Sequence, residues 1–353
     1  MASYCTRSAQ PLLSAVVPFL DEAGNLPQLI SRLEQVLSSL QLDWELVLVD
    51  DGSRDDGVEV AKRELQLRPG LQATVLSLSR NFGKEAALTA GLAAARGDVV
   101  VPLDADLQDP PELIGPMLEH WREGFDVVYA VRRRRNGEGR IKRLTAFGFY
   151  RLMGRLSETA IPADTGDFRL MDRCVVEALA QLPERSRFMK GLFAWVGFSQ
   201  TALYYDRDAR TCGSSGWNYW RLWNLALDGI TAFSRVPLQL LSVGGVAIAT
   251  VALLYGLWMV LRTLVIGVDL PGYASLMTAV LLLGGLQLIA LGVLGEYLGR
   301  VFEEVKARPL YLVRERWAQG VDNMNAMEKA GKTAEKPIDR LNYSDRSETL
   351  RGL

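Results

Sequence analysis

Between residues 12 and 129, short apolar runs rich in Val and Leu alternate with longer stretches whose apolar positions recur with a helical period. Runs of the first kind predict β-strands, and stretches of the second kind predict amphipathic helices. The predicted strands are residues 12–17, 44–49, 73–77, 99–103 and 126–130, and the predicted helices are residues 25–40, 57–68, 84–95 and 111–123. This order of elements predicts an α/β fold with a mainly parallel sheet.

The pattern changes after Arg235, where two apolar runs of 26 residues, 236–261 and 270–295, contain no charged side chain. At about 1.5 Å per residue, each run is long enough to cross the roughly 30 Å hydrocarbon core of a bilayer. Only eight residues separate the two runs, so they predict a transmembrane hairpin. A pair of buried core helices in a large soluble protein is the alternative, but such long neighbouring runs are rare there.

Basic residues gather outside this hairpin, whereas its connecting loop has one Arg and one Asp. The flanking basic residues are Arg221, Arg235, Arg300, Lys306, Arg308, Arg314 and Arg316. Because Lys and Arg next to membrane spans stay on the cytoplasmic side, both termini are predicted to be cytoplasmic. No signal peptide is expected, because Pro18, Asp21 and Glu22 interrupt the first apolar stretch.

The sequence therefore divides into five parts. Residues 1–211 are the expected soluble domain, and the Trp-rich residues 212–235 predict a helix lying in the membrane interface, with an ordinary amphipathic core helix as the alternative. Residues 236–298 form the expected hairpin and residues 299–317 a juxtamembrane segment. Residues 318–353 are polar and mixed in charge, which predicts a mobile tail.

Composition excludes several classes of function. The 40 basic and 41 acidic residues give a net charge of -1, so no overall basic field favours a nucleic-acid partner. The three cysteines have no metal-ligand spacing and His120 is the single histidine, so a Cys/His zinc site cannot be assembled. The sequence also lacks a phosphate-binding P-loop and a dinucleotide-binding glycine motif after the first predicted strand.

Polar residues follow four consecutive predicted strands. They are Asp21 and Glu22 (with Pro18 before them), then Asp50, Asp51 and Ser53, then Arg80 and Asn81, and then Asp104 and Asp106. Each group alone is compatible with a helix cap or a turn. Together they predict a binding site, because ligands of parallel α/β sheets lie outside the carboxyl ends of the strands.

Asp104 and Asp106 stand two positions apart, directly after a predicted buried strand. Carboxylate oxygens are ligands that suit Mg²⁺ or Mn²⁺, and such an ion can bridge a diphosphate and neutralise its charge. The pair therefore predicts a metal site for a nucleotide diphosphate.

The run Asp104 to Glu112 stands after two further motifs, LVLVDDGSRD (46–55) and LSRNFGKEAALTAGL (78–92). With these motifs the chain resembles, over about residues 12–316, the family 2 glycosyltransferases of GT-A fold that charge polyisoprenyl phosphates. That group contains dolichol-phosphate mannose synthase, bacterial polyprenyl-phosphate glucosyltransferases and undecaprenyl-phosphate 4-deoxy-4-formamido-arabinose transferase. The resemblance implies a Rossmann-like catalytic domain, a bacterial inner membrane location and a homo-oligomer packed through its hairpins.

The resemblance also implies roles for individual residues. It assigns nucleotide-sugar recognition to Pro18, Asp21, Glu22, Asp50, Asp51 and Asp104, and metal binding to Asp104, Asp106 and Gln108. It places a carboxylate beside the sugar, for which Asp167 is the first candidate and Asp164 the second. The alternative for Asp167 is a cap on a helix beginning near Met171.

Acceptor binding requires positive charge near the membrane, and seven of the twelve residues from 132 to 143 are basic. The resemblance implies that such a segment grips the lipid phosphate, although a charge run is more often a solvated face. The candidates for this phosphate are Arg132, Arg134, Arg140, Lys142, Arg143, Arg187 and Lys190.

The expected reaction is an inverting single displacement, in which a polyprenyl phosphate oxygen attacks the anomeric carbon of a nucleotide sugar. UDP-glucose is the first expectation for the donor, with UDP-4-deoxy-4-formamido-arabinose and GDP-mannose as alternatives. A processive polysaccharide synthase is a rival, but the sequence has neither its QxxRW motif nor its additional spans. A catalytically inactive membrane-anchored binding or scaffold protein is the rival from another class.

Overall fold

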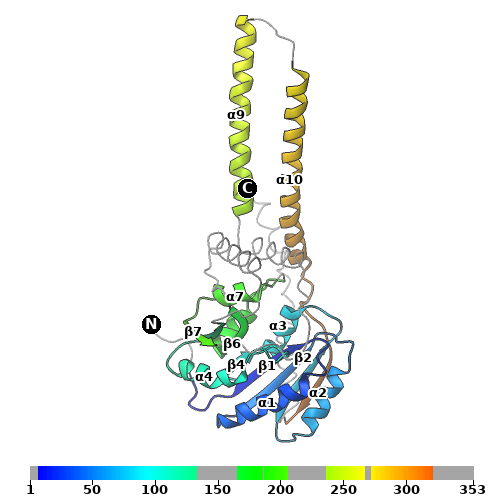
Figure 1. The fold of residues 1–353 in the computed structure, drawn as a ribbon, viewed down its shortest axis with the longest axis vertical. Coiled ribbons are helices and arrows are strands. Elements are labelled where there is room, and N and C mark those ends of the chain that lie inside the picture. The colour runs from blue at the N-terminus through cyan, green and yellow to red at the C-terminus, as the bar shows by residue number, and fades with distance from the viewer. Residues whose placement is uncertain (1–6, 133–164, 186, 206–235, 267–271, 321–353) are drawn as a thin grey trace, which may run out of the picture.

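The computed structural model describes residues 7–132, 165–185, 187–205, 236–266 and 272–320 (Figure 1). These residues form an α/β domain and two long helices that rise from it. The interfacial segment 212–235 and residues 321–353 of the predicted tail lie outside the described residues.

One sheet of eight strands forms the centre of the domain, in the order β7-β5-β6-β4-β1-β2-β3-β8. The strands are β1 (Leu13–Phe19), β2 (Trp44–Asp50), β3 (Gln72–Leu78), β4 (Val99–Pro102), β5 (Val127–Arg132), β6 (Thr165–Asp172), β7 (Gln200–Tyr205) and β8 (Val313–Gln319). β4, β1, β2 and β3 are parallel neighbours, whereas β6 runs antiparallel to both β4 and β5. The mainly parallel sheet confirms the predicted fold class.

Helices cover both faces of the sheet. They are α1 (Leu26–Ser39), α2 (Gly57–Gln66), α3 (Lys84–Ala94), α4 (Ile114–Arg122), α6 (Arg173–Ala180) and α7 (Met189–Trp195), with a short 3₁₀ turn η1 (Pro111–Leu113) before α4. The predicted helix 111–123 is thus a 3₁₀ turn followed by an α-helix. Pro111 stands at the first position of the turn, where its missing N–H would have no helical partner in any case.

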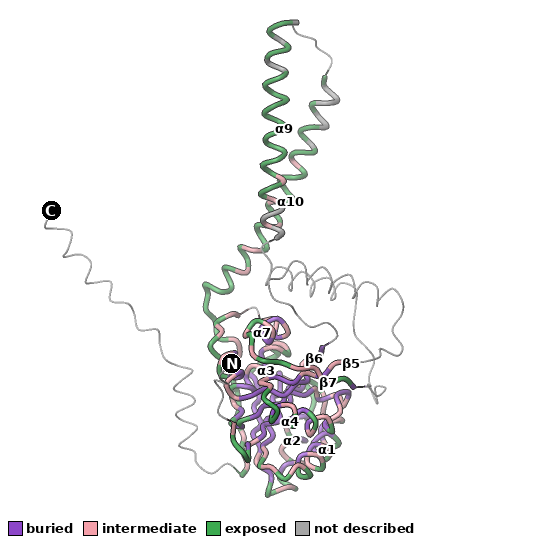
Figure 2. Tube along the Cα trace, turned by 90° about the vertical axis from the view of Figure 1, so that its left-hand side faces the viewer, coloured by how far each residue is buried: buried purple, intermediate pink, exposed green. Residues whose placement is uncertain are grey.

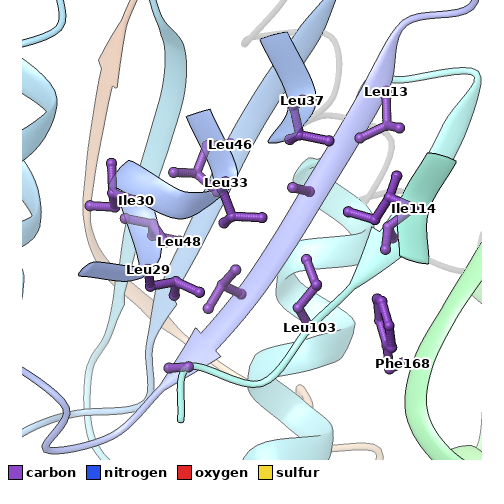
Figure 3. Close-up of a cluster of buried hydrophobic side chains, with 14 of the residues drawn as sticks. Leu13, Leu29, Ile30, Leu33, Leu37, Leu46, Leu48, Leu103, Ile114 and Phe168 are labelled. Carbon is purple, nitrogen blue, oxygen red and sulfur yellow. The ribbon is translucent and has the colours of Figure 1, made fainter. Parts of the chain in front are cut away.

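α1, α2 and α4 pack on one face of the sheet. The buried residues of α1 recur at helical spacing and turn one apolar stripe toward the strands. Figure 3 shows this stripe, formed by Leu29, Ile30, Leu33 and Leu37, against Leu13, Leu46 and Leu48. Burial of each such Leu or Ile side chain contributes roughly 1.5–3 kcal/mol.

α3, α6 and α7 pack on the opposite face. The approach of α3 to β1 requires a glycine, because a Cβ at Gly91 would overlap the side chain of Val16. This close packing holds α3 against β1.

The two predicted spans are α9 (Val236–Ile266) and α10 (Tyr273–Lys306), both long and apolar enough to cross a membrane. Their side chains are mostly exposed, in contrast to the buried sheet (Figure 2). Exposed Leu and Val along such lengths fit a lipid surround rather than a protein core. α10 begins three residues later than the predicted 270 and continues beyond 298 to Lys306.

The polar tail begins later than the sequence predicted, because β8 extends beyond residue 317. We expected the polar tail to begin at Ala318, but Ala318 and Gln319 belong to β8 and pair with Thr74 and Ala73 of β3. The Gln319 amide also donates to the carbonyl oxygens of Leu65 (2.9 Å) and Arg68 (2.8 Å). The chain therefore returns from α10 to complete the sheet.

Candidate active site

The predicted site residues gather at one edge of the sheet, because β1, β2, β3 and β4 are parallel and end there. The loops after β1 and β2 are joined by hydrogen bonds. The Asp21 N–H donates to Ser53 Oγ (3.0 Å), and the Arg54 N–H donates to Asp21 Oδ1 (2.7 Å). Asp21 adopts a φ of 55°, a left-handed conformation that Asp tolerates better than most residues.

The loop after β2 contacts the loop after β3 in the same way. Asp51 accepts the N–H groups of Phe82 (2.8 Å) and Gly83 (3.0 Å). Gly52 has a φ of 75°, and a Cβ there would lie 2.5 Å from the carbonyl carbon of Arg80. Burial raises the pKa of Asp51, while the two N–H groups oppose this shift. The three loops thus form one connected polar surface.

Asp50 contributes a free acceptor to this surface. Its Oδ1 accepts the Ser53 N–H (2.8 Å), whereas its buried Oδ2 has no hydrogen-bond partner among the described residues. Nearby, Glu22 Oε2 lies 2.5 Å from the Asn25 amide nitrogen, and Pro18 is buried within β1. A buried carboxylate oxygen without a partner suits a donor group supplied by a ligand.

Lys84 lies between two candidate carboxylates. Its Nζ is 2.6 Å from Asp104 Oδ1 and 2.6 Å from Asp167 Oδ2. Lys84 begins α3, Asp104 follows β4, and Asp167 lies in β6, so three separate segments meet at one ammonium group. The structure therefore brings the predicted metal-side and sugar-side carboxylates together.

Asp167 lies in a strand rather than at a helix terminus. The alternative role for Asp167 was a helix N-cap. Asp172 fills that role instead, because it accepts the Cys174 N–H (3.0 Å) at the start of α6. Burial alone would raise the pKa of Asp167, but Lys84, Lys190 and Arg169 outweigh burial and lower it. The carboxylate is therefore ionised at neutral pH. Its buried Oδ1 has no hydrogen-bond partner among the described residues.

The donor set at Asp104 and Asp106 fits a divalent cation that is also bound by a substrate. Asp106 Oδ1 accepts the Gln108 N–H (3.1 Å), and the buried Gln108 Nε2 has no partner among the described residues. Within the described part of the chain, no three His, Cys, Asp or Glu side chains converge as a closed metal site. Two carboxylates are still sufficient for Mg²⁺, which usually retains several ligands from phosphate and water.

Sequence reasoning missed Lys84, Glu85 and Arg169. Glu85 is half-buried, and burial together with the charge of Asp167 raises its pKa to about 7. Arg169 stacks 3.7 Å over the ring of Phe193, and burial lowers its pKa to about 10. The sequence feature that could have identified Lys84 and Glu85 as site residues is their position shortly after the polar end of the third strand.

The structure describes three of the candidates for the lipid phosphate. Arg132 ends β5, and Lys190 lies near enough to Asp167 to lower its pKa. The Arg187 guanidinium donates to the carbonyl oxygens of Leu182 (2.8 Å) and Glu184 (3.2 Å), which leaves less of it for a ligand. Asp164 and the remaining basic candidates, Arg134, Arg140, Lys142 and Arg143, lie outside the described residues.

Comparison with known protein families fits this geometry. Residues 14–180 match the model of glycosyl transferase family 2, and residues 236–301 match the GtrB C-terminal hairpin. An uncharacterized glycosyltransferase of Synechocystis, sll0501, is 55% identical over 86% of this chain and 95% of its own length. The chain therefore belongs to glycosyltransferase family 2, with the GT-A type of sheet.

A second relative has a more specific name. The SfII prophage-derived bactoprenol glucosyl transferase of Shigella flexneri is 45% identical over 86% of this chain and 97% of its own length. Among solved structures, mannosyl-3-phosphoglycerate synthase from Rubrobacter xylanophilus is 24% identical with a TM-score of 0.44, covering 66% of this chain and 75% of that one.

Proposed function

We propose that this protein transfers glucose from UDP-glucose to a polyprenyl phosphate at the membrane, with inversion at the anomeric carbon. The relative named as a bactoprenol glucosyl transferase supports both the sugar and the acceptor, because its similarity covers 97% of its own length, hairpin included. The product, a polyprenyl-phosphate-glucose, would serve modification of a cell-envelope glycan.

The observation on which the proposal depends is the meeting of Asp104 and Asp167 at Lys84, with 2.6 Å to each carboxylate. A transferase of this type needs a cationic environment for the leaving diphosphate beside a carboxylate for the sugar. Lys84, together with the divalent cation that Asp104 would hold, provides the first, and Asp167 provides the second. We assign nucleotide contacts to Asp21, Asp50 and Asp51. These assignments are predictions.

Asp104 and Asp106, with Gln108 as a further candidate, would hold a divalent cation, Mg²⁺ or Mn²⁺. When bound, such an ion neutralises the charge that develops on the departing diphosphate. Lys84 adds a positive charge from the protein itself at the same place. Electrostatic stabilisation of this kind is usually the largest contribution to catalysis.

In the displacement, an oxygen of the lipid phosphate forms a bond to the anomeric carbon of glucose, and the bond from this carbon to the UDP oxygen breaks. The electron pair of the broken bond leaves with UDP. A phosphate monoester has a second pKa near 6, so the nucleophile is largely anionic at pH 7 and needs no strong base. The ionised Asp167 would accept a hydrogen bond from a sugar hydroxyl and orient the ring.

The acceptor reaches this site from the membrane. α9 and α10 would anchor the domain to the bilayer, with both termini on the cytoplasmic side as the flanking basic residues predict. Arg132 and Lys190, with the basic residues between 133 and 143, are our candidates for holding the lipid phosphate.

The test is transfer of radiolabel to undecaprenyl phosphate by the full chain in detergent. UDP-glucose, GDP-mannose and UDP-4-deoxy-4-formamido-arabinose are supplied separately, each with Mg²⁺, with Mn²⁺ or with a chelator. We expect lipid label from UDP-glucose only, abolished by the chelator and by Asp106→Ala. Label from another donor would overturn the sugar assignment. No transfer from any donor by folded protein would favour a binding or scaffold protein.

A further inference from the structure

A cavity of about 1030 Å³ lies between the C-terminal end of α10 and the sheet domain. Its walls come from the loop after β3, from the loop after α6, from the last turns of α10 and from the segment that leads to β8. Figure 1 shows the corresponding end of α10 where it reaches the domain. The mechanism proposed above leaves this cavity without a role.

The charge of the cavity is positive. Of the described side chains that line it, five are basic and two are acidic. The basic residues are Arg80, Arg185, Arg300, Lys306 and Arg308. The acidic residues are Glu296 and Glu303. A concave surface with this excess concentrates anions.

The contacts among the lining side chains leave at least one hydrogen-bond donor, on Arg185, for a ligand. Arg300 pairs with Glu296 at 3.4 Å, and Lys306 lies 4.0 Å over the ring of Phe302. The Arg185 backbone N–H donates to Glu304 Oε1 (2.8 Å), whereas its buried side-chain Nε has no partner among the described residues. Because a buried guanidinium N–H is costly to leave unpaired, an anionic acceptor in the cavity would be favourable.

The position of the cavity corresponds to the headgroup level of a bilayer. The uncharged sequence of α10 ends at Gly295, and the charged residues that face the cavity begin at Glu296. Such a change from apolar to charged residues marks the membrane interface, where lipid phosphates lie. The lining also includes Phe302, Leu310 and Leu312, which suit the apolar part of a lipid.

The cavity is separate from the candidate active site. Asp104, Asp106, Asp167 and Lys84 are not among its described lining residues. The loop after β3 lies between the two places: Arg80 and Phe82 line the cavity, while the Phe82 N–H binds Asp51 in the site. A ligand phosphate in the cavity would therefore lie on the far side of this loop from the Lys84 bridge.

We propose that this cavity binds the phosphate of an anionic bilayer phospholipid and thereby docks the catalytic domain against the membrane. The headgroup would receive hydrogen bonds from Arg185 and Arg308, and its glycerol and upper acyl carbons would contact Phe302. The site is distinct from that of the acceptor lipid and does not depend on the identity of the transferred sugar.

The test measures lipid binding to the delipidated full chain in an uncharged detergent by native mass spectrometry. The probes are phosphatidylglycerol, phosphatidylcholine and undecaprenyl phosphate. The cavity variant is Arg185→Gln with Arg308→Gln. The matched control is Arg314→Gln with Arg316→Gln, which removes the same charge from exposed positions of the neighbouring strand β8.

We expect wild type and control to bind phosphatidylglycerol equally, and the cavity variant to bind it at least tenfold more weakly. Phosphatidylcholine should bind more weakly than phosphatidylglycerol, and undecaprenyl phosphate should not displace the latter. Equal loss in the control would show non-specific attraction and overturn the proposal. Displacement by undecaprenyl phosphate, or equally well by inorganic phosphate, would also overturn it.

A second variant distinguishes a loss of lipid binding from a loss of folding. A Cβ at Gly299 would meet no heavy atom within 4 Å, so Gly299→Leu extends into the cavity without removing charge. It should weaken phosphatidylglycerol binding while thermal stability is retained. Unchanged binding in both the charge variant and this filled variant would rule out the cavity as the lipid site.

Discussion

The Nζ of Lys84 lies 2.6 Å from Oδ2 of Asp167, and the same ammonium lies 2.6 Å from Asp104 Oδ1. One positive charge therefore holds together two carboxylates, one from the loop after β4 and one from β6. Without it, Asp104 and Asp167 would repel each other across the place proposed for the sugar and its diphosphate. The geometry of the candidate site thus depends on a residue that none of its acidic motifs contains.

Replacing Lys84 tests this dependence. We expect Lys84→Met to lower kcat/KM for glucosyl transfer about 100-fold, the effect typical of removing one preorganised charge partner from an active site. Lys62→Met is the control, because Lys62 pairs with Glu59 and Glu315 on the surface near β8. Near-wild-type turnover of folded Lys84→Met would contradict a role for the bridge.

The pH dependence of stability tests the environment of Glu85. Its folded pKa of about 7 exceeds the ordinary 4.5, so between these values the folded chain binds more protons than the unfolded chain. Stability due to Glu85 is therefore present at low pH and is lost as the pH rises through 7. Glu85→Gln should remove this loss, which is at most about 3 kcal/mol.

The measurement is the thermal midpoint in detergent at pH 5 and at pH 8, for wild type and Glu85→Gln. The wild-type midpoint should fall further across this range than that of the variant. Parallel changes in the two proteins would mean that Glu85 titrates normally.

Gly52 tests the contact between the loops after β2 and β3. Gly52→Ala places a methyl group 2.5 Å from the Arg80 carbonyl carbon at a φ of 75°, so the loop carrying Asp51 must shift. We expect an approximately tenfold increase in the KM for the nucleotide sugar, corresponding to about 1.4 kcal/mol. Gly70→Ala is the control, since its Cβ would meet nothing within 4 Å. Similar KM values in both variants would exclude the loop contact as a determinant of donor binding.

Two truncations test β8. A chain ending at Gly320 keeps the strand and should retain the wild-type thermal midpoint. A chain ending at Pro309 loses β8 and its pairing with β3, so it should unfold at a lower temperature and aggregate through the uncovered strand edge. If both chains melted alike, β8 would contribute nothing to stability.

The sequence predicted the first part of the fold well because its signals are local. Buried strands such as residues 46–49 and the apolar stripe of α1 are recognisable within a few residues. β8 gave no such signal, since Arg314, Glu315 and Arg316 are exposed at the sheet edge and their sequence reads as polar. Its strand conformation depends on the distant partner β3.

The candidate site was predictable in part for the same reason. Asp104 and Asp106 are recognisable after one strand, but the bridge to Asp167 requires β6 to insert between β4 and β5. No local pattern specifies that insertion, and none indicates that Lys84 points toward both carboxylates. The roles of individual residues in donor and acceptor binding stay predictions.

The order of the strands along the chain has a consequence for synthesis. A ribosome makes β1 to β7 before the two long helices, and β8 only after them. One edge of the sheet, at β3, therefore still lacks its neighbour when the two helices have been made. The domain can acquire its final strand only once α9 and α10 have been made, which couples completion of the sheet to synthesis of the two long helices.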